Sequence, residues 1–253
     1  MRKTKIVCTL GPATDDPAVL EAMIDEGMNV ARFNFSHSNY EEHLKRLSML
    51  KEAREKKHKY IAALLDTKGP EIRVCKFKDG KIMLETGKEF TLTTRDVEGD
   101  ESIVSVTYKD FPSDVSIGTR VLIDDGLIEL KVIEKNDTDV KCVVINPGPV
   151  SDNKGVNLPG TVVSMPYMSE KDIADINFAV DNDFDFIAAS FARTAGDILK
   201  IRRILDERNC SSISIIAKIE NKQGVENIDE ILQVSDGVMI ARGDMGVEIP
   251  YED

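Results

Sequence analysis

Residues 60–70, YIAALLDTKGP, mark the point at which the pattern of this chain changes. The apolar run at 60–65 is typical of a parallel strand that is buried on both faces, and the Asp-Thr-Lys-Gly-Pro after it ends that strand. Before this stretch, short apolar runs alternate with amphipathic segments. After it the alternation stops, and it resumes only beyond Pro166. We therefore expect Pro70 to be the boundary between two kinds of domain.

The chain before this boundary reads as repeated β-α units. The expected elements are strands at 5–10, 29–35 and 60–65, with helices from about 17 to 27 and at 40–57. Asp16 is expected to cap the first helix and Gly27 to stop it. Because β-α-β units place successive strands side by side in the same direction, this part predicts a parallel sheet.

The segment between Pro70 and Pro166 has a sequence pattern typical of β-strands and turns. It contains β-branched runs, the turn dipeptides Asp79-Gly80 and Asp125-Gly126, and no convincing helical period. Two apolar runs at 127–133 and 140–145, separated by a polar turn, predict a hairpin. We expect residues 70–166 to form a small inserted all-β domain.

After Pro166 the β-α rhythm returns. The expected elements are helices at 169–181, 194–208 and 225–234, and strands at 184–191, 214–219 and 237–241. The α/β part then has six strands and 253 − 97 = 156 residues, whereas a closed eight-stranded barrel needs roughly 200 or more. Two architectures stay open: a doubly wound sheet, or a (β/α)8 barrel of which about six strands are present.

The composition limits the classes of protein that need consideration. Hydrophobic residues make up 42% and charged residues 31%, which excludes disordered and collagen-like chains. The net charge of −12 disfavours nucleic acid as a partner. No apolar stretch approaches the ~18 residues of a membrane helix, and no signal-peptide core follows the initial MRKTK. We expect a soluble, cytoplasmic protein that binds neither membranes nor nucleic acid.

Cysteine and histidine spacing points away from disulfides and zinc. The four cysteines are far apart and form no C-x-x-C pair. The three histidines lie in no H-E-x-x-H motif and have no cysteine neighbourhood. We expect free thiols and no transition-metal site.

Polar side chains gather where the predicted strands of the α/β part end. They are Arg32, Asn34, Ser36, Asp66, Thr67, Lys218, Glu220 and Asp244. Each alone has an ordinary structural reading, such as a salt bridge between Lys218 and Glu220 on one strand face. Together they favour a site, because the carboxyl ends of parallel strands form the site in both architectures.

The residue types at these strand ends fit one another chemically. Glu220 and Asp244 offer hard oxygen ligands for an Mg²⁺ ion that keeps positions open for water and substrate. Arg32 and Lys218 supply positive charge for a phosphoryl group. The oxygens that suit a larger monovalent cation belong to Asn34, Ser36 and Asp66. The residues alone therefore indicate metal-dependent handling of a small phosphorylated or carboxylated anion.

Eight segments carry a resemblance to a known family. In chain order they are KTKIVCTLGPA, NVARFNFSH, LLDTKGPEIR, NKGVNLPG, SEKDIADINFA, DFIAASFAR, IIAKIEN and SDGVMIARGDMGVEIP. From about residue 2 to its end the chain resembles the pyruvate kinase family. The resemblance implies a TIM-type (β/α)8 barrel domain, incomplete here, at 1–69 and 167–253. It also implies a mobile, β-barrel-like lid domain at 70–166.

The resemblance also implies a reaction. Enzymes of this family transfer the phosphoryl group of phosphoenolpyruvate to ADP, giving pyruvate and ATP in the last step of glycolysis. They use Mg²⁺ (or Mn²⁺) and K⁺, and the full-length members are usually homotetramers. We therefore expect phosphoenolpyruvate, pyruvate, ADP and ATP as ligands of the whole protein.

Roles carry over by resemblance, position by position. Lys218 matches the lysine that stabilises the transition state, Arg32 the arginine that contacts the phosphate, and Gly243 a backbone contact to the substrate carboxylate, beside Asp244. The implied Mg²⁺ ligands are Glu220 and Asp244, and the implied K⁺ ligands are Asn34, Ser36, Asp66 and the Thr67 carbonyl. The implied nucleotide-binding residues are Asn34, His37, Arg73 and Lys154.

Some features depart from the family pattern. Ser38 stands where the family usually has glycine, and Met245 where leucine is usual. The last two barrel strands, the threonine linked to proton transfer and the C-terminal domain are absent. Two alternatives therefore stay open: a catalytically silent amino-terminal fragment that only binds metal or ligand, or another Mg²⁺-dependent barrel enzyme acting on pyruvate or another enolate.

Six strands cannot close a barrel of eight, so the first and sixth strands would each present an unpaired edge. Apolar residues near these edges would lose neighbours; examples are Ile6, Val7, Val238 and Ile240. We expect either the ordered part of a longer chain or a fragment that associates through its edges, with little or no turnover of its own.

Overall fold

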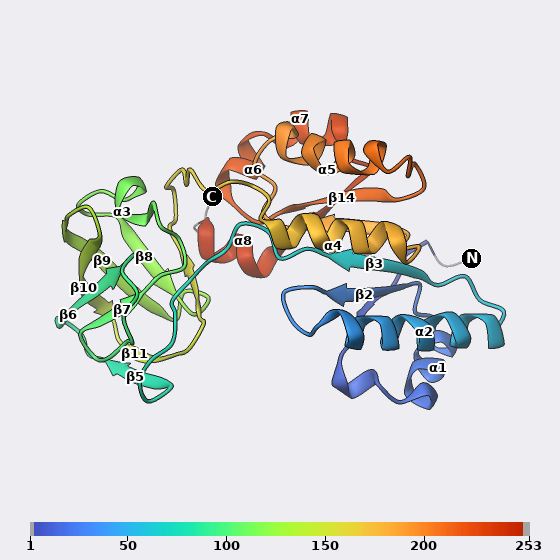
Figure 1. Cartoon of the computed structure of the whole chain (residues 1–253), viewed down its shortest axis with the longest axis horizontal. Helices are drawn as coiled ribbons and strands as arrows, with labels where there is room; N and C mark the ends of the chain where they lie inside the picture. Colours follow the sequence, from blue (N-terminus) through green and yellow to red (C-terminus); the bar gives the residue numbers. More distant parts are fainter. Residues whose placement is uncertain (1–2, 250–253) are drawn as a thin grey trace. The chain divides into compact units, whose positions relative to one another are not determined.

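The computed structural model describes residues 3–249, which divide into two compact units (Figure 1). The first unit contains the chain up to residue 69 together with 167–219 and 227–239. The second contains 70–166, 220–226 and the chain from residue 240. The function of 70–166 as a lid stays a prediction.

The first unit is built on a single six-stranded sheet in the order β1-β2-β3-β13-β14-β15. The strands are β1 (Val7–Thr9), β2 (Val30–Asn34), β3 (Ala62–Asp66), β13 (Phe186–Ala189), β14 (Ser214–Ile219) and β15 (Gly237–Ile240). Neighbours from β1 to β14 pair in parallel. The spatial order follows the chain order without a reversal. A doubly wound sheet reverses its strand order, so this is an incomplete (β/α)8 barrel.

Helices connect the strands. In the first unit they are η1 (Pro12–Thr14), α1 (Pro17–Asp25), α2 (Tyr40–Lys56), α4 (Glu170–Asp181), α5 (Ala195–Glu207) and α7 (Ile228–Val234). Helices α1, α2 and α4 begin at a side-chain cap. The Asp16 side chain accepts from the Ala18 amide at the start of α1, as predicted. Ser169 and Asp172 form the predicted capping box of α4.

Asp172 also binds Gly69, the residue after which the chain leaves the first unit. Its Oδ1 accepts from the Gly69 amide at 3.0 Å, while Oδ2 accepts from the Ser169 amide at 2.9 Å. Gly69 has φ +69°, and a Cβ at this position would lie 2.8 Å from the Ser190 carbonyl oxygen. Glycine is therefore required here by both conformation and space.

Two expected elements differ from the structure. The helix expected at 225–234 is two helices, α6 (Lys222–Glu226) and α7, interrupted at Asn227, whose side-chain amide donates to the Arg193 carbonyl. The strand expected to end in a turn at Arg242 is instead followed by α8 (Arg242–Glu248). The break at Asn227 depends on a contact with a distant segment, which hydrophobic periodicity does not reveal. The seven-residue helix α8 has no side-chain cap, so the sequence carried no start signal for it.

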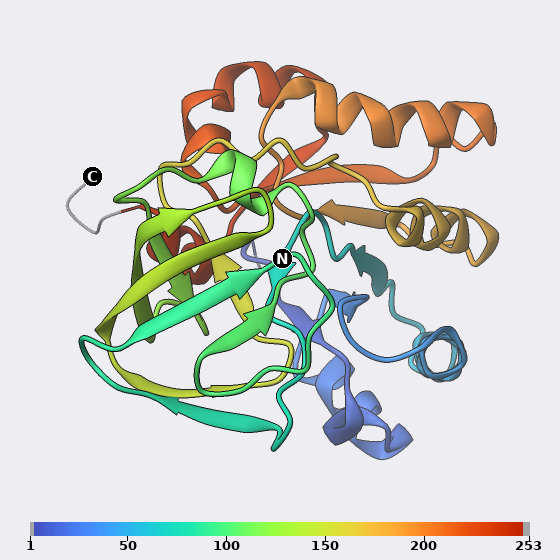
Figure 2. The ribbon, with the colours of Figure 1, turned by 60° about the vertical axis from the view of Figure 1, so that its left-hand side comes forward.

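The second unit contains a seven-stranded sheet in the order β4-β12-β8-β9-β10-β6-β7 and a two-stranded sheet, β11-β5. Its elements are β4 (Ile72–Arg73), β5 (Lys81–Leu84), β6 (Glu89–Thr93), β7 (Ile103–Ser105), α3 (Phe111–Asp114), β8 (Arg120–Ile123), β9 (Ile128–Lys135), β10 (Asp139–Asn146), β11 (Gly148–Ser151) and β12 (Gly155–Asn157). The predicted hairpin is β9–β10. Figure 2 shows the strands wrapped around a common interior.

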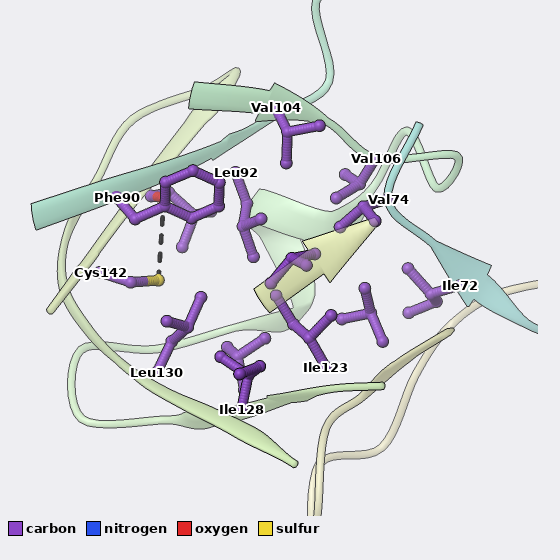
Figure 3. Close-up of a cluster of buried hydrophobic side chains, with 14 of the residues drawn as sticks. Ile72, Val74, Phe90, Leu92, Val104, Val106, Ile123, Ile128, Leu130 and Cys142 are labelled. Atoms are coloured by element: carbon purple, nitrogen blue, oxygen red, sulfur yellow. Dashed lines mark hydrogen bonds between the residues drawn. The ribbon is translucent and has the colours of Figure 1, made fainter. Parts of the chain in front are cut away.

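This interior is a hydrophobic core made of β-strand side chains (Figure 3). Phe90, Leu92, Leu130 and Cys142 have no exposed area. Burial raises the pKa of the Cys142 thiol to about 12, so this residue is an inert apolar side chain. All four cysteines are free, as predicted.

Two further observations concern the surface. Strands β1 and β15 are the ends of the six-stranded sheet, and Val7, Val238 and Ile240 are 48%, 37% and 54% exposed, as expected for apolar residues at sheet edges. Within residues 3–249, no helix combines the length and the apolar character needed to cross a membrane.

A matched pair of substitutions tests whether the two units unfold separately. Leu92 in the second unit and Leu50 in the first are both fully buried, so each change to alanine is expected to cost about 2–5 kcal/mol. In native-state hydrogen exchange, Leu92→Ala should speed exchange in β9 and β10 and leave β2 and β3 unchanged. Leu50→Ala should do the reverse. Equal loss of protection in both units for either variant would contradict this division.

Candidate active site

The site of the first unit is centred on Asp66, the last residue of β3. Its side chain is 1% exposed, and Arg32 on the neighbouring strand β2 donates from Nε to Oδ2 at 2.5 Å. Arg32 also donates from Nη1 to Thr9 Oγ1 at 2.8 Å, so its guanidinium is fixed from two sides. The Arg32 side chain keeps 26% of its surface exposed, and a ligand can therefore reach it.

Lys218 approaches the same carboxylate from β14. Its Nζ lies 3.1 Å from Asp66 Oδ1 and 2.8 Å from Ser190 Oγ. The Lys218 side chain is only 11% exposed. Since an unpaired buried charge is costly, these contacts with the carboxylate stabilise the buried ammonium. Two cations, Arg32 and Lys218, therefore share the one carboxylate of Asp66.

Ser190 completes the cluster, and the sequence analysis did not identify it. It follows β13 directly, is 2% exposed, and donates from Oγ to Asp66 Oδ1 at 3.0 Å while accepting from Lys218. Its amide donates to Thr67 Oγ1 at 3.2 Å. The available signal was its place after an apolar run at the carboxyl end of a parallel strand, which is also the position of Asp66.

Asn34 and Ser36 lie beside Asp66, where β2 ends. Asn34 is directly opposite Asp66 in the register of β2 and β3. Its side-chain oxygen accepts from the Ser36 amide at 3.1 Å. The Phe35 amide donates to the Asp66 carbonyl oxygen at 2.9 Å, which ties the turn after β2 to β3. His37, the next predicted site residue, is exposed.

Glu220 and Asp244 follow the last two strands of the sheet at different distances. Glu220 follows β14 directly and is 1% exposed, whereas Asp244 follows β15 by four residues, in the first turn of α8, and is exposed. Strands β14 and β15 are neighbours in the sheet. A Cβ built on Gly243 would meet no atom within 4 Å, so the space beside this backbone is open.

Arg73 and Lys154 belong to the second unit, on two paired segments. Gly155 of β12 pairs with Arg73 of β4, and the Val74 amide donates to the Lys154 carbonyl at 2.9 Å. Arg73 Nη2 lies 2.8 Å from Glu71, and Arg73 Nη1 donates to the Asn153 carbonyl at 2.7 Å. Lys154 pairs with Asp124 at 2.8 Å. These pairs orient both cations.

Within residues 3–249, no group of three or more His, Cys, Asp or Glu side chains is arranged to hold a metal ion. Mg²⁺ does not require such a group, because proteins often bind it through one or two carboxylates and leave the remaining positions to water and substrate. The pair Glu220 and Asp244 fits that description.

Comparison with known proteins identifies the family. The family described as "Pyruvate kinase, barrel domain" matches residues 1–253. The chain belongs to the pyruvate kinase family. Pyruvate kinases of Staphylococcus haemolyticus, Staphylococcus epidermidis and Staphylococcus aureus are each 52% identical to it over 254 residues. The match covers 100% of this chain and 43% of each relative. The chain thus spans less than half the length of these curated relatives.

Family membership has two consequences for the sequence analysis. The resemblance and the barrel architecture are confirmed. The alternative of an unrelated Mg²⁺-dependent enolate enzyme loses its support, because the family match extends over the inserted residues 70–166 as well as the barrel strands.

Ser190→Ala tests the hydrogen-bond bridge of the cluster. Removing the hydroxyl takes one partner each from Lys218 and Asp66 inside the protein, so the free energy of unfolding should fall by about 1–3 kcal/mol. Ser48→Ala, at an exposed position of α2, should change it by less than about 0.5 kcal/mol. Urea unfolding monitored by circular dichroism measures both. Equal stability of Ser190→Ala and the unchanged chain would argue against the bridge.

Proposed function

We propose that the protein containing this chain is a pyruvate kinase, which transfers the phosphoryl group of phosphoenolpyruvate to ADP and yields pyruvate and ATP. One observation carries the proposal: in a chain of this family, Arg32 from β2 and Lys218 from β14 both contact the buried Asp66 carboxylate at the end of β3. Phosphoryl transfer depends mainly on positioning and charge neutralisation, and this cluster supplies both.

The two cations have different parts in the proposed reaction. Among the described residues, the contacts of Arg32 with Asp66 and Thr9 use two of the five N–H donors of a guanidinium. Its partly exposed side chain can therefore bind phosphate oxygens of the substrate. Lys218 is more deeply buried and held by Ser190 and Asp66. A fixed ammonium of this kind stabilises negative charge that moves from the phosphate to the enolate oxygen.

Glu220 and Asp244 are the proposed Mg²⁺ ligands. Their carboxylates follow adjacent strands, and two carboxylates leave coordination positions for substrate oxygens. When bound, Mg²⁺ (or Mn²⁺) would supply further positive charge at the phosphate and the enolate oxygen. The open backbone beside Gly243 is proposed to contact the substrate carboxylate.

Asn34, Ser36, Asp66 and the Thr67 carbonyl are the proposed K⁺ ligands. The register of β2 and β3 supports this, because it places Asn34 directly opposite Asp66. The set mixes neutral and anionic oxygens, which suits a weakly hydrated monovalent cation. When bound, K⁺ would add positive charge beside Arg32 without competing for the carboxylates that Mg²⁺ needs.

Arg73 and Lys154 are proposed to bind nucleotide phosphates, together with Asn34 and His37. Their positions on two paired segments support this, because both cations then belong to one region of the second unit. We further propose that the whole protein is cytoplasmic and, like full-length members of the family, a homotetramer.

Lys218→Met tests the proposed catalytic lysine. Loss of one preorganised charge should lower kcat by roughly 10²–10³. The assay couples pyruvate formation to lactate dehydrogenase and uses the whole protein that contains this chain. Lys56→Met, an exposed residue of α2, is the control and should leave kcat unchanged. A Lys218→Met protein with near-normal kcat would remove the lysine from the mechanism.

Glu220→Gln tests the divalent site without an activity assay. Replacing a ligand carboxylate by an amide should weaken Mn²⁺ binding at least about tenfold, measured by electron paramagnetic resonance of free Mn²⁺. Glu226→Gln, whose side chain is exposed on α6, serves as the control. The ligand assignment fails if the two variants bind Mn²⁺ equally.

A further inference from the structure

The turn between β2 and α2, residues 35–39, is held by side chains that the proposed reaction does not use. The turn has the sequence FSHSN and carries Ser36 and His37. A turn of this length has few contacts of its own, so its conformation depends on the side chains that bind it. Three side chains from α2 and α4 do so: Lys171 and His43 contact carbonyl groups, and Arg46 contacts the Ser38 hydroxyl.

Lys171 fixes the first residue of the turn. Its Nζ donates to the Phe35 carbonyl at 3.0 Å and to Asp175 Oδ2 at 2.6 Å. Asp175 is fully buried, and its second oxygen accepts from the Tyr40 hydroxyl at 2.7 Å. Burial raises the pKa of Tyr40 to about 12, so the hydroxyl keeps its proton and can donate. The Lys171 ammonium also lies 5.8 Å from the centroid of the Phe35 ring.

His43 fixes the middle of the turn. It is 3% exposed, and its Nε2 lies 3.1 Å from the His37 carbonyl oxygen, which can only accept. Burial lowers the pKa of His43, so the ring is neutral and carries its proton on Nε2. Nδ1 then has no partner among the described residues, a cost that an apolar side chain would avoid. The ring also stacks on Phe35, with centroids 4.0 Å apart and planes at 6°.

Arg46 fixes Ser38. Ser38 has φ +67°, a left-handed conformation that favours glycine. Arg46 Nη1 donates to Ser38 Oγ at 3.0 Å, and Asp15 holds the guanidinium with bonds of 2.7 and 3.0 Å. The hydrogen bond to Arg46 lowers the pKa of Asp15, so this pair stays charged. A serine at this position is thus stabilised by a partner that glycine cannot use.

We propose that Lys171 and His43 are positioning residues for the monovalent-cation site. Ser36 lies between Phe35 and His37, and the carbonyls of both neighbours are anchored, so the direction of the Ser36 side chain is set by these two residues. Neither residue is itself a ligand. The inference rests on the proposed K⁺ site, and it assigns the shape of that site to side chains behind the turn, the buried His43 and Asp175 and the half-exposed Lys171.

Thallium-205 NMR tests this in the 253-residue chain, with Tl⁺ as the probe for K⁺. Lys171→Met and His43→Leu should raise the Tl⁺ dissociation constant about tenfold, the loss expected when a hydrogen bond from a fixed donor is removed. Lys171→Arg and His43→Gln keep a donor at the same place and should retain most of the affinity. Lys45→Met, an exposed neighbour on α2, should have no effect.

Urea unfolding of the same variants separates positioning from stability. Lower stability with an unchanged Tl⁺ dissociation constant in folded Lys171→Met and His43→Leu would overturn the inference and leave the cation site in place. Absence of any Tl⁺ signal in the unchanged chain would count against the cation site and the inference together. If Lys171→Met does not fold, Tyr40→Phe removes only the hydroxyl that holds Asp175, and it should weaken Tl⁺ binding by a smaller factor that remains measurable.

Discussion

The buried carboxylate of Asp66 is the constraint around which the first unit is organised. Moving an ion out of water costs several kcal/mol, and the cost is offset only when partners of opposite charge and hydrogen-bond donors surround it. Three residues surround the Asp66 carboxylate: Arg32 from β2, Lys218 from β14, and Ser190, which directly follows β13. These partners reach one carboxylate because the strands run in parallel and end at the same level. The charges of the proposed site and the strand order are therefore stabilised by the same contacts.

Further polar side chains bind the main chain next to the residues that surround Asp66. The turn after β2 is bound by Lys171 and His43, and α4 begins at a capping box in which Asp172 also binds Gly69. These residues lie behind the strand ends and fix main-chain atoms. The turn after β2 and the start of α4 are thus restrained by partly buried hydrogen bonds to main-chain atoms.

Sequence patterns predicted the strands and helix starts well for physical reasons that particular residues show. Strands buried on both faces appear as apolar runs such as 60–65, and helix starts were identified from local side chains such as Asp16 and Ser169. The break at Asn227 and the role of Ser190 could not be predicted, because both depend on contacts between segments far apart in the chain. Periodicity alone also left the choice between a barrel and a doubly wound sheet open; strand order decided it.

The attachment of residues 70–166 has a consequence for domain replacement. The chain leaves the first unit at Gly69 and re-enters α4 at Ser169, and one carboxylate, Asp172, binds the amides of both residues. The ends of the insertion are therefore held together by the barrel unit itself. Since closure entropy grows only with the logarithm of loop length, doubling the insertion would add only about 0.6 kcal/mol. A folded domain of quite different size could be grafted between these two amides while the barrel strands keep their register.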